Sequence, residues 1–275
     1  FFDFYLGEGQ NYGIPMKTIA VFFVLNFTII SSIVWLLLRY FVQQRDVYAA
    51  ELATQHAQVR IEREKSERVL TSILPHHVAE RLKKNPGTIA DGYADVSVMF
   101  ADIVDFTKLA EELAPNQVVD FLDNVFSRLD ELVDRRRLDK IKTIGDAYMV
   151  AGGLGGDRLN YVDQVADLAL EMIELSRTDP TLRRYGMQLH VGIATGPAIA
   201  GVIGSTRFAY DLWGDTVNIA NRLTAEASAG TILVDKTTYR RLGQRFAFED
   251  GKEIQVKGKG PMNVYRLTGK NSSPG

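Results

Sequence analysis

An uncharged apolar run at residues 18–38 dominates the first part of the chain and is long enough to cross a membrane. At about 1.5 Å per helical residue, such a run covers the roughly 30 Å hydrocarbon core of a bilayer. Arg39 and Arg45 follow it, so the positive-inside rule places the following bulk in the cytoplasm. A cleaved signal peptide and a buried soluble helix are the alternatives, but no small-residue cleavage site follows the run. We therefore expect an extracytoplasmic or interfacial segment at 1–17 and a plasma-membrane helix at 18–42.

The next stretch, residues 43–74, is rich in Glu, Arg, Gln, Ala and Lys, which favour helix. One series of positions in this stretch recurs in steps of three and four, as in a coiled-coil seam with apolar ends and a polar middle: Ala49, Leu52, His56, Val59, Arg63, Ser66, Leu70 and Ile73. This pattern predicts a weakly paired dimer helix, with an ordinary solvated linker helix as the alternative. Pro75 should end the helix, and the turn at 85–87 should end a second short one. We assign 43–90 to signalling helices.

Residues 91–268 have the length of one catalytic domain, about 180 residues. Alternating or continuous apolar runs predict strands at 96–101, 138–144, 147–151, 188–194, 198–203, 231–234, 253–256 and 263–267. Helical patterns lie between them at 115–136, 161–176 and 216–227. This order indicates an α+β domain with helices packed on a largely antiparallel sheet. We expect the tail at 269–275 to be disordered.

Composition and charge narrow the possible functions. The 275 residues are 46% hydrophobic and 24% charged, which is typical of a globular protein. The net charge of −2 gives no electrostatic case for binding nucleic acid. The absence of cysteine excludes disulfides and cysteine nucleophiles, and the four histidines lack zinc-ligand spacing. Because the chain begins at Phe1 without a methionine, we expect it to belong to a longer protein with further membrane helices.

Two aspartates stand at the ends of apolar runs in the catalytic-sized domain. Asp102 follows the run 96–101, and Asp146 lies in the turn between 138–144 and 147–151. Two strand-end carboxylates on one sheet suit a pair of hard divalent cations such as Mg²⁺, which take further ligands from substrate phosphates. The alternative is that both are solvated turn residues.

A second group of polar residues begins where a loop at 210–214 enters a helix. Asp215 or Thr216 should cap this helix. Asn218 and Arg222 are four residues apart, so they share one helix face and together can reach a sugar and a phosphate. An ion pair between Arg222 and Glu226 is the structural alternative.

Lysines near these motifs are further candidates. Lys142 alternates with Lys140 and should share its strand face, although such pairs are usually only solvated strand edges. Lys257 and Lys259 lie between glycines and could clamp a phosphate, but this signal is weak.

The four motifs at 100–107, 142–147, 211–222 and 257–260 together resemble, in order, those of the class III nucleotidyl cyclase catalytic domain. The resemblance spans about 96–267 and implies a ferredoxin-like fold that cyclises a nucleoside triphosphate. The segment 70–82 is similar to the short transducer helix that precedes such domains. The resemblance is to membrane-anchored bacterial homodimeric adenylate cyclases.

This resemblance implies roles for the metal-binding and base-binding residues. Asp102, Asp146 and the carbonyl of Ile103 would hold two Mg²⁺ or Mn²⁺ ions per site. Lys142 and Asp211 would read the base. Asp211 can accept from the N6 amine of adenine and Lys142 can donate to N1, whereas guanine would leave both groups unpaired. ATP is therefore the expected substrate.

The resemblance also implies that Asn218 orients the ribose, that Arg222 stabilises the transition state, and that Lys259 or Lys257 contacts the triphosphate. Each site would be shared across a homodimer, with the metal aspartates from one chain and the other residues from its partner. The expected partners are ATP, a second copy, membrane lipid and further membrane helices, but no nucleic acid.

Two residues depart from the family pattern: Asp105 replaces a frequent glycine, and Pro197 stands where some members have a phosphate-binding arginine. A guanylate cyclase is disfavoured by Lys142 and Asp211. A cyclase-like domain that only dimerises should lack a metal aspartate or Arg222, and this chain retains all three. No motif matches a diguanylate cyclase or a polymerase palm.

Overall fold

The computed structural model describes residues 15–84, 89–155, 160–204, 209–256 and 259–271, apart from the side chains of 68–73, 76–77, 250 and 256. Several expectations fall outside these ranges: residues 1–14 of the N-terminal segment, the turn at 85–87, Lys257, and residues 272–275 of the tail. Residues 1–69 and 70–275 form two separate compact units.

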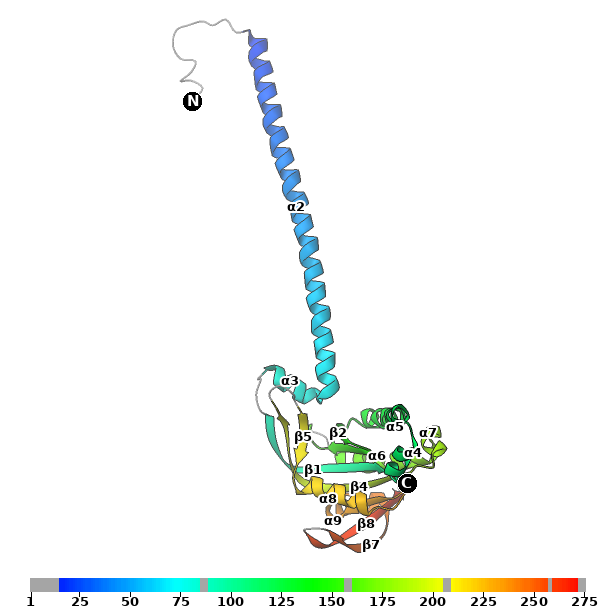
Figure 1. Cartoon of the computed structure of the whole chain (residues 1–275). Coiled ribbons are helices and arrows are strands. Elements are labelled where there is room, and N and C mark those ends of the chain that lie inside the picture. The colour runs from blue at the N-terminus through cyan, green and yellow to red at the C-terminus, as the bar shows by residue number, and fades with distance from the viewer. Residues whose placement is uncertain (1–14, 85–88, 156–159, 205–208, 257–258, 272–275) are drawn as a thin grey trace. The chain divides into compact units, whose positions relative to one another are not determined.

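Helix α2 (Met16–Ile73) forms almost all of the described part of the first unit (Figure 1). By length and composition it contains one stretch that could cross a membrane, and none of that stretch is buried. Asn26, Thr28 and Ser32 donate to carbonyls four residues earlier, at 2.9, 2.7 and 2.7 Å. These bonds lower the cost of placing polar side chains in lipid. The linker is helical as expected; its pairing with a second copy stays a prediction.

The second unit is an α+β domain, which confirms the expected fold class (Figure 1). Its helices are α3 (His76–Lys84), α4 (Phe106–Glu112), α5 (Pro115–Arg136), α6 (Tyr161–Thr178), α7 (Pro180–Arg184), α8 (Asp215–Glu226), α9 (Lys236–Leu242) and the 3₁₀ turn η1 (Gly243–Arg245). Its strands are β1 (Ile89–Ile103), β2 (Asp139–Ile144), β3 (Ala147–Gly152), β4 (Leu189–Ile203), β5 (Ala209–Trp213), β6 (Ile232–Asp235), β7 (Phe246–Val256) and β8 (Gly260–Lys270).

The strands form one sheet in the order β2-β3-β1-β4-β6-β8-β7, with β5 paired to β4. The pairing of β4 with β6 is parallel, and the other pairings are antiparallel. Side chains alternate between two cores along β1, as the strand period requires: Met99 and Ala101 join the core with α5 and α6, whereas Val98 and Phe100 join the core with α3 and α8. The central strands are thus covered on both faces.

Three local expectations were wrong. The strands expected at 188–194 and 198–203 are one strand, β4, because Pro197 lies at a register shift opposite β1, where its missing N–H interrupts no regular ladder. The loop expected at 210–214 is mostly strand β5, with Tyr210 and Leu212 buried. The tail expected to be disordered from residue 269 is ordered up to 271, because β8 continues to Lys270 and the backbone N–H of Asn271 donates to the Arg245 carbonyl at 3.0 Å. Helices α4, α7 and α9 were not predicted, because they are too short to give a clear sequence period.

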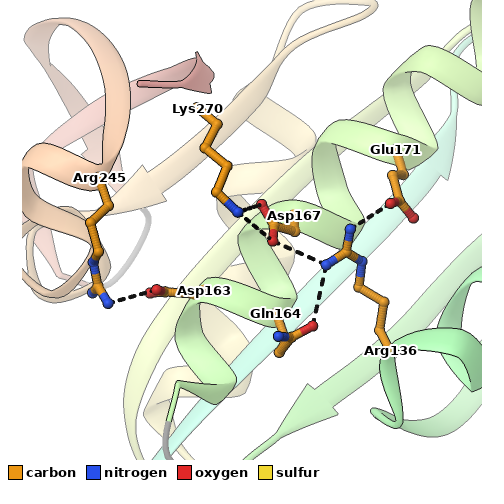
Figure 2. A network of polar contacts seen from close by, with 7 residues as sticks. All are labelled: Arg136, Asp163, Gln164, Asp167, Glu171, Arg245 and Lys270. Atoms are coloured by element: carbon orange, nitrogen blue, oxygen red, sulfur yellow. Dashed lines mark hydrogen bonds and ion pairs between the residues drawn. The ribbon is translucent and has the colours of Figure 1, made fainter. Parts of the chain in front are cut away.

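A charged network ties α6 to its neighbours (Figure 2). Arg136, the last residue of α5, donates to Asp167 at 3.0 Å and to Glu171. Lys270 at the end of β8 donates to Asp167 at 3.0 Å, and Arg245 pairs with Asp163 at 2.6 Å. Asp163, Asp167 and Glu171 are four residues apart, so one face of α6 receives cations from three other elements.

We expect Arg136→Met to lower the free energy of unfolding by about 1–3 kcal/mol, because it leaves Glu171 without its cation and the partly buried Asp167 with Lys270 alone. The Arg136 side chain is only 21% exposed. Urea unfolding of the detergent-solubilised chain measures the effect. The control is Arg266→Met, whose pair with Glu249 is exposed and should contribute below about 1 kcal/mol. Equal losses in the two variants would contradict a special role for the network.

Candidate active site

The two candidate metal acids meet at one end of the sheet. Asp102 is the penultimate residue of β1, and Asp146 lies in the two-residue turn between β2 and the neighbouring β3. Gly145, the other turn residue, has φ +63°, a conformation that favours glycine in tight hairpins. The hairpin therefore delivers Asp146 beside the end of β1.

Ionisation of the two acids is linked. Burial and the charge of Asp102 raise the pKa of Asp146 to about 6. Burial opposes ionisation of Asp102, but contact with His190 and a hydrogen bond with Asp146 lower its pKa below the ordinary value. Two neighbouring carboxylates that resist carrying two charges form a suitable set of oxygen donors for a divalent cation. Within the described residues, no cluster of three or more His, Cys, Asp or Glu side chains could hold a metal alone.

Asp105 does not add a third free carboxylate to this pair. It pairs with Lys108 at 2.7 Å, and both side chains are exposed. Its φ of 59° is a left-handed conformation that aspartate tolerates better than most residues. This conformation explains physically why glycine suits the position.

The candidate base-reading residues form an ion pair. Lys142 Nζ lies 2.5 Å from Asp211 Oδ2, and the side chains are 36% and 20% exposed. The other oxygen of Asp211 accepts from the backbone N–H of Leu212 at 2.8 Å, which fixes the carboxylate. Asp211 is held on β5 rather than on the expected loop.

Lys142 and Lys140 do not share a face, contrary to expectation. A register shift in the pairing with β3 falls between them and breaks the alternation. Lys140 instead reaches Asp130 on α5 at 2.6 Å, so only Lys142 joins Asp211.

Helix α8 carries Asn218 and Arg222. Asn218 is exposed and Arg222 is half-buried, and neither has a hydrogen-bond or ion-pair partner among the described side chains. The alternative pair of Arg222 with Glu226 is not formed, although the structure describes both residues. Both polar groups therefore stay available to a ligand.

Helix α8 is fixed against the sheet by close backbone approach. A Cβ at Gly192 of β4 would lie 2.3 Å from the N of Thr224 and 2.4 Å from the carbonyl of Ala220, so only glycine fits there. The hydroxyl of Thr224 also donates to the Phe100 carbonyl on β1 at 3.2 Å.

The expected cap of α8 was wrong, because other contacts occupy the two candidates. Gly214 is the N-cap residue. The hydroxyl of Thr216 donates to the Pro197 carbonyl at 2.7 Å, and the carboxylate of Asp215 pairs with Lys259. Lys259 is thus placed near the start of α8.

Contacts between described side chains join four of the candidate residues into two pairs. Asp102 and Asp146 form one group, and Lys142 with Asp211 forms another. Across the described ranges, no hydrogen bond or ion pair joins the two acids to Lys142, Asp211, Asn218, Arg222 or Lys259.

His190 is a polar residue at the acids that the sequence reasoning missed. Its Nε2 lies 3.6 Å from Asp102 Oδ2, and its Nδ1 lies 2.8 Å from the carbonyl of Ala227. Burial would lower the pKa of His190, but the contacts with Asp102 and Ala227 raise it. Zinc-ligand spacing could not point to His190, because its partners Asp102 and Ala227 are adjacent to it in space and not in sequence.

Residues 89–269 match the family described as the adenylate and guanylate cyclase catalytic domain. The chain belongs to this family. The resemblance to class III nucleotidyl cyclases is therefore confirmed, with residue 89, the start of β1, as the first residue of the matched cyclase domain.

Relatives of the cyclase domain carry both adenylate and guanylate names. "Adenylate cyclase" proteins of Mycobacterium tuberculosis and Mycobacterium bovis are each 43% identical over 221 residues, covering 80% of this chain and 50% of theirs. The human "Guanylate cyclase soluble subunit beta-2" is 36% identical, covering 79% of this chain and 36% of its own. The chain spans about half the length of the mycobacterial relatives.

Solved cyclase structures share the fold. The guanylate cyclase domain of RhGC from Catenaria anguillulae, in complex with GTP, has a TM-score of 0.64 and 30% identity, covering 66% of this chain and all of that one. The adenylyl cyclase CyaB from P. aeruginosa has a TM-score of 0.59 and 27% identity, covering 69% of this chain and all of that one.

Proposed function

We propose that this chain is the catalytic part of an adenylate cyclase, which converts ATP to 3′,5′-cyclic AMP and pyrophosphate. The ion pair between Lys142 and Asp211 carries the proposal, because it holds one donor and one acceptor side by side. Adenine offers the complementary pair, an acceptor at N1 and a donor at N6. Guanine offers a donor at N1 and an acceptor at position 6, which would set Lys142 against a donor and Asp211 against an acceptor.

The two acids are the proposed metal ligands. Asp102 and Asp146, with the carbonyl of Ile103, would hold two Mg²⁺ or Mn²⁺ ions per site, in keeping with the oxygen chemistry of these ions. The bound ions would lower the pKa of the ribose 3′-hydroxyl and neutralise triphosphate charge. The raised pKa of Asp146 supports this assignment, because a bound cation would offset both its causes, the burial of the carboxyl and the repulsion by Asp102.

The remaining residues act on the sugar and the phosphates. Asn218 would orient the ribose, and Arg222 would donate to oxygens on which charge builds in the transition state, so its contribution should appear in kcat. Lys259 would contact the triphosphate after leaving Asp215. No protein side chain is required as a general base.

The working unit is proposed to be a homodimer with two equivalent sites. Among the described residues of one chain, no hydrogen bond or ion pair links Asp102 and Asp146 to Lys142 and Asp211, which is consistent with a site that takes the acids from one chain and the other pair from its partner. Helix α2 would anchor the dimer in the plasma membrane, with the catalytic domain in the cytoplasm, as Arg39 and Arg45 after the apolar run indicate.

A guanylate cyclase is the competing function, and relatives with that name make it a real alternative. A domain that only dimerises is less consistent with this chain, because Asp102, Asp146 and Arg222 are all present. The deciding experiment incubates the purified chain with ATP or GTP plus Mn²⁺ and identifies the product by mass. Cyclic GMP without cyclic AMP would reject the adenylate proposal, and no cyclic product from either nucleotide would reject catalysis.

We expect the double substitution Lys142→Glu with Asp211→Cys to lower the ratio of kcat/KM for ATP over GTP by at least about tenfold. The glutamate can accept from guanine N1 and N2, and the cysteine is a weak donor to O6. The gain for GTP should be modest, because a 1 Å misplacement is costly. The matched control is Lys140→Glu, since Lys140 pairs with Asp130 on α5 and should not change the ratio. An unchanged ratio in the double variant would show that these residues do not read the base.

A further inference from the structure

His190 lies between the first candidate metal acid and the end of the helix that carries Arg222. It faces Asp102 directly across the antiparallel pairing of β1 with β4. Opposite residues on one sheet face have Cβ atoms only about 4.5–5.5 Å apart, so the strand pairing itself makes the side chains of His190 and Asp102 neighbours. The side chain of His190 is only 15% exposed.

One edge of the His190 ring is fixed by helix α8. Its Nδ1 lies 2.8 Å from the carbonyl of Ala227, the C-cap residue of α8. A carbonyl can only accept, so Nδ1 must carry the hydrogen, and this bond sets the ring orientation. Ala227 is itself held by its N–H bond to the Thr224 carbonyl at 3.0 Å. The ring is therefore anchored to a helix end that is packed on the sheet.

The other edge of the ring faces Asp102. His190 Nε2 is 3.6 Å from Asp102 Oδ2, slightly beyond hydrogen-bond length, while Asp102 Oδ1 accepts from the backbone N–H of Ile103 at 3.1 Å. Both carboxylate oxygens are thus flanked by fixed groups. Residues that orient a metal ligand in this way typically change metal affinity 10–100-fold when they are replaced.

We propose that His190 is a positioning residue that fixes the Asp102 carboxylate against the C-terminal end of α8 and so prepares it to bind a divalent cation. This inference rests on the proposed function, in which Asp102 is a metal ligand. His190 touches no substrate atom in this role, and it binds no metal itself.

The test separates the two ring edges by substitution in the full chain. His190→Asn keeps an amide donor near the Nδ1 position but removes the Nε2 edge. His190→Gln places an amide near the Nε2 position but gives up the short bond to Ala227. His190→Leu removes both edges at similar volume. Mn²⁺ affinity is measured by electron paramagnetic resonance with 3′-deoxy-ATP, which cannot cyclise, and melting temperature is measured without metal.

We expect His190→Leu and His190→Asn to weaken Mn²⁺ binding by about tenfold or more, and His190→Gln to stay within about threefold of the unmodified chain. The melting temperature of His190→Asn should lie closer to that of the unmodified chain than the melting temperature of His190→Leu does, because asparagine keeps a donor for the Ala227 carbonyl. Unchanged Mn²⁺ affinity in His190→Leu would overturn the proposal, as would equal weakening in the Gln and Leu variants.

The Mn²⁺ measurement also separates this inference from the proposed function. Asp102→Ala should weaken Mn²⁺ binding at least as much as His190→Leu does; if Asp102→Ala leaves the Mn²⁺ affinity unchanged, Asp102 is no ligand and the His190 role falls with it. If Mn²⁺ binds as expected but ATP yields no cyclic AMP, the adenylate cyclase proposal fails and the His190 result stands.

Discussion

Asp102→Ala and Asp146→Ala should each lower cyclic AMP formation at saturating ATP and Mn²⁺ by about a thousandfold or more. Metal stabilisation of transition-state charge is worth several kcal/mol, and each 1.36 kcal/mol is a factor of ten in rate. Turnover by the purified variants measures the effect. The matched control is Asp105→Asn, which removes a carboxylate charge three residues from Asp102 that is paired with Lys108 and exposed, and which keeps a residue that tolerates the left-handed φ. Full activity in either metal variant would refute the metal assignment.

The same variants should not lose their fold, which separates a chemical defect from a structural one. On folding, the pKa of Asp146 rises from 3.8 to about 6. An acid with a raised pKa destabilises the folded state once it ionises, so metal-free stability should fall as pH rises from about 4 to about 6. Asp146→Ala should abolish that fall. Melting temperatures of the unmodified chain and of Asp146→Ala, measured in EDTA across this pH range, test the sign. A melting temperature of Asp146→Ala at pH 7 far below that of the unmodified chain would contradict the prediction.

The second large effect is the recovery of activity on mixing two inactive variants, Asp102→Ala and Arg222→Ala. If each site takes its acids from one chain and Arg222 from the other, the mixed dimer has one site with both lesions and one site with neither. Random pairing then gives about a quarter of the unmodified activity per chain, because half of the dimers are mixed and each has one working site. Co-expression with two affinity tags, followed by tandem purification, isolates the mixed dimer for assay.

A second mixture serves as the control for this experiment. Asp102→Ala and Asp146→Ala lie in the same residue group, so every site of their mixed dimer lacks one acid. This mixture should stay inactive. Recovery in both mixtures would contradict the assignment of both acids of a site to one chain, and recovery in neither, with mixed dimers demonstrated, would reject shared sites.

The strand-end acids were predictable from the sequence because an apolar run followed by aspartate is a local pattern, and the β2–β3 turn is only two residues long. The position of Asp211 was assigned to the wrong element, since β5 exists through its pairing with β4 and not through its own short sequence. The bulge beside Lys142 could not be predicted for a similar reason, because a register shift depends on how two strands pair and not on the sequence of one strand. His190 was missed because its significance comes from Asp102, 88 residues earlier in the chain.

The uninterrupted helix α2 has a mechanical consequence. Its part in the first unit, residues 16–69, contains no glycine and no proline, the two residue types that most often break or kink a helix. An α-helix advances about 100° per residue, and seven residues return it to within about 20° of the same direction. Within the first unit, the angular direction of each side chain in the apolar run, relative to the polar stretch at 43–69, is thus set by residue count alone. Rotation of the apolar run about the helix axis would therefore rotate the polar stretch up to residue 69 by the same angle.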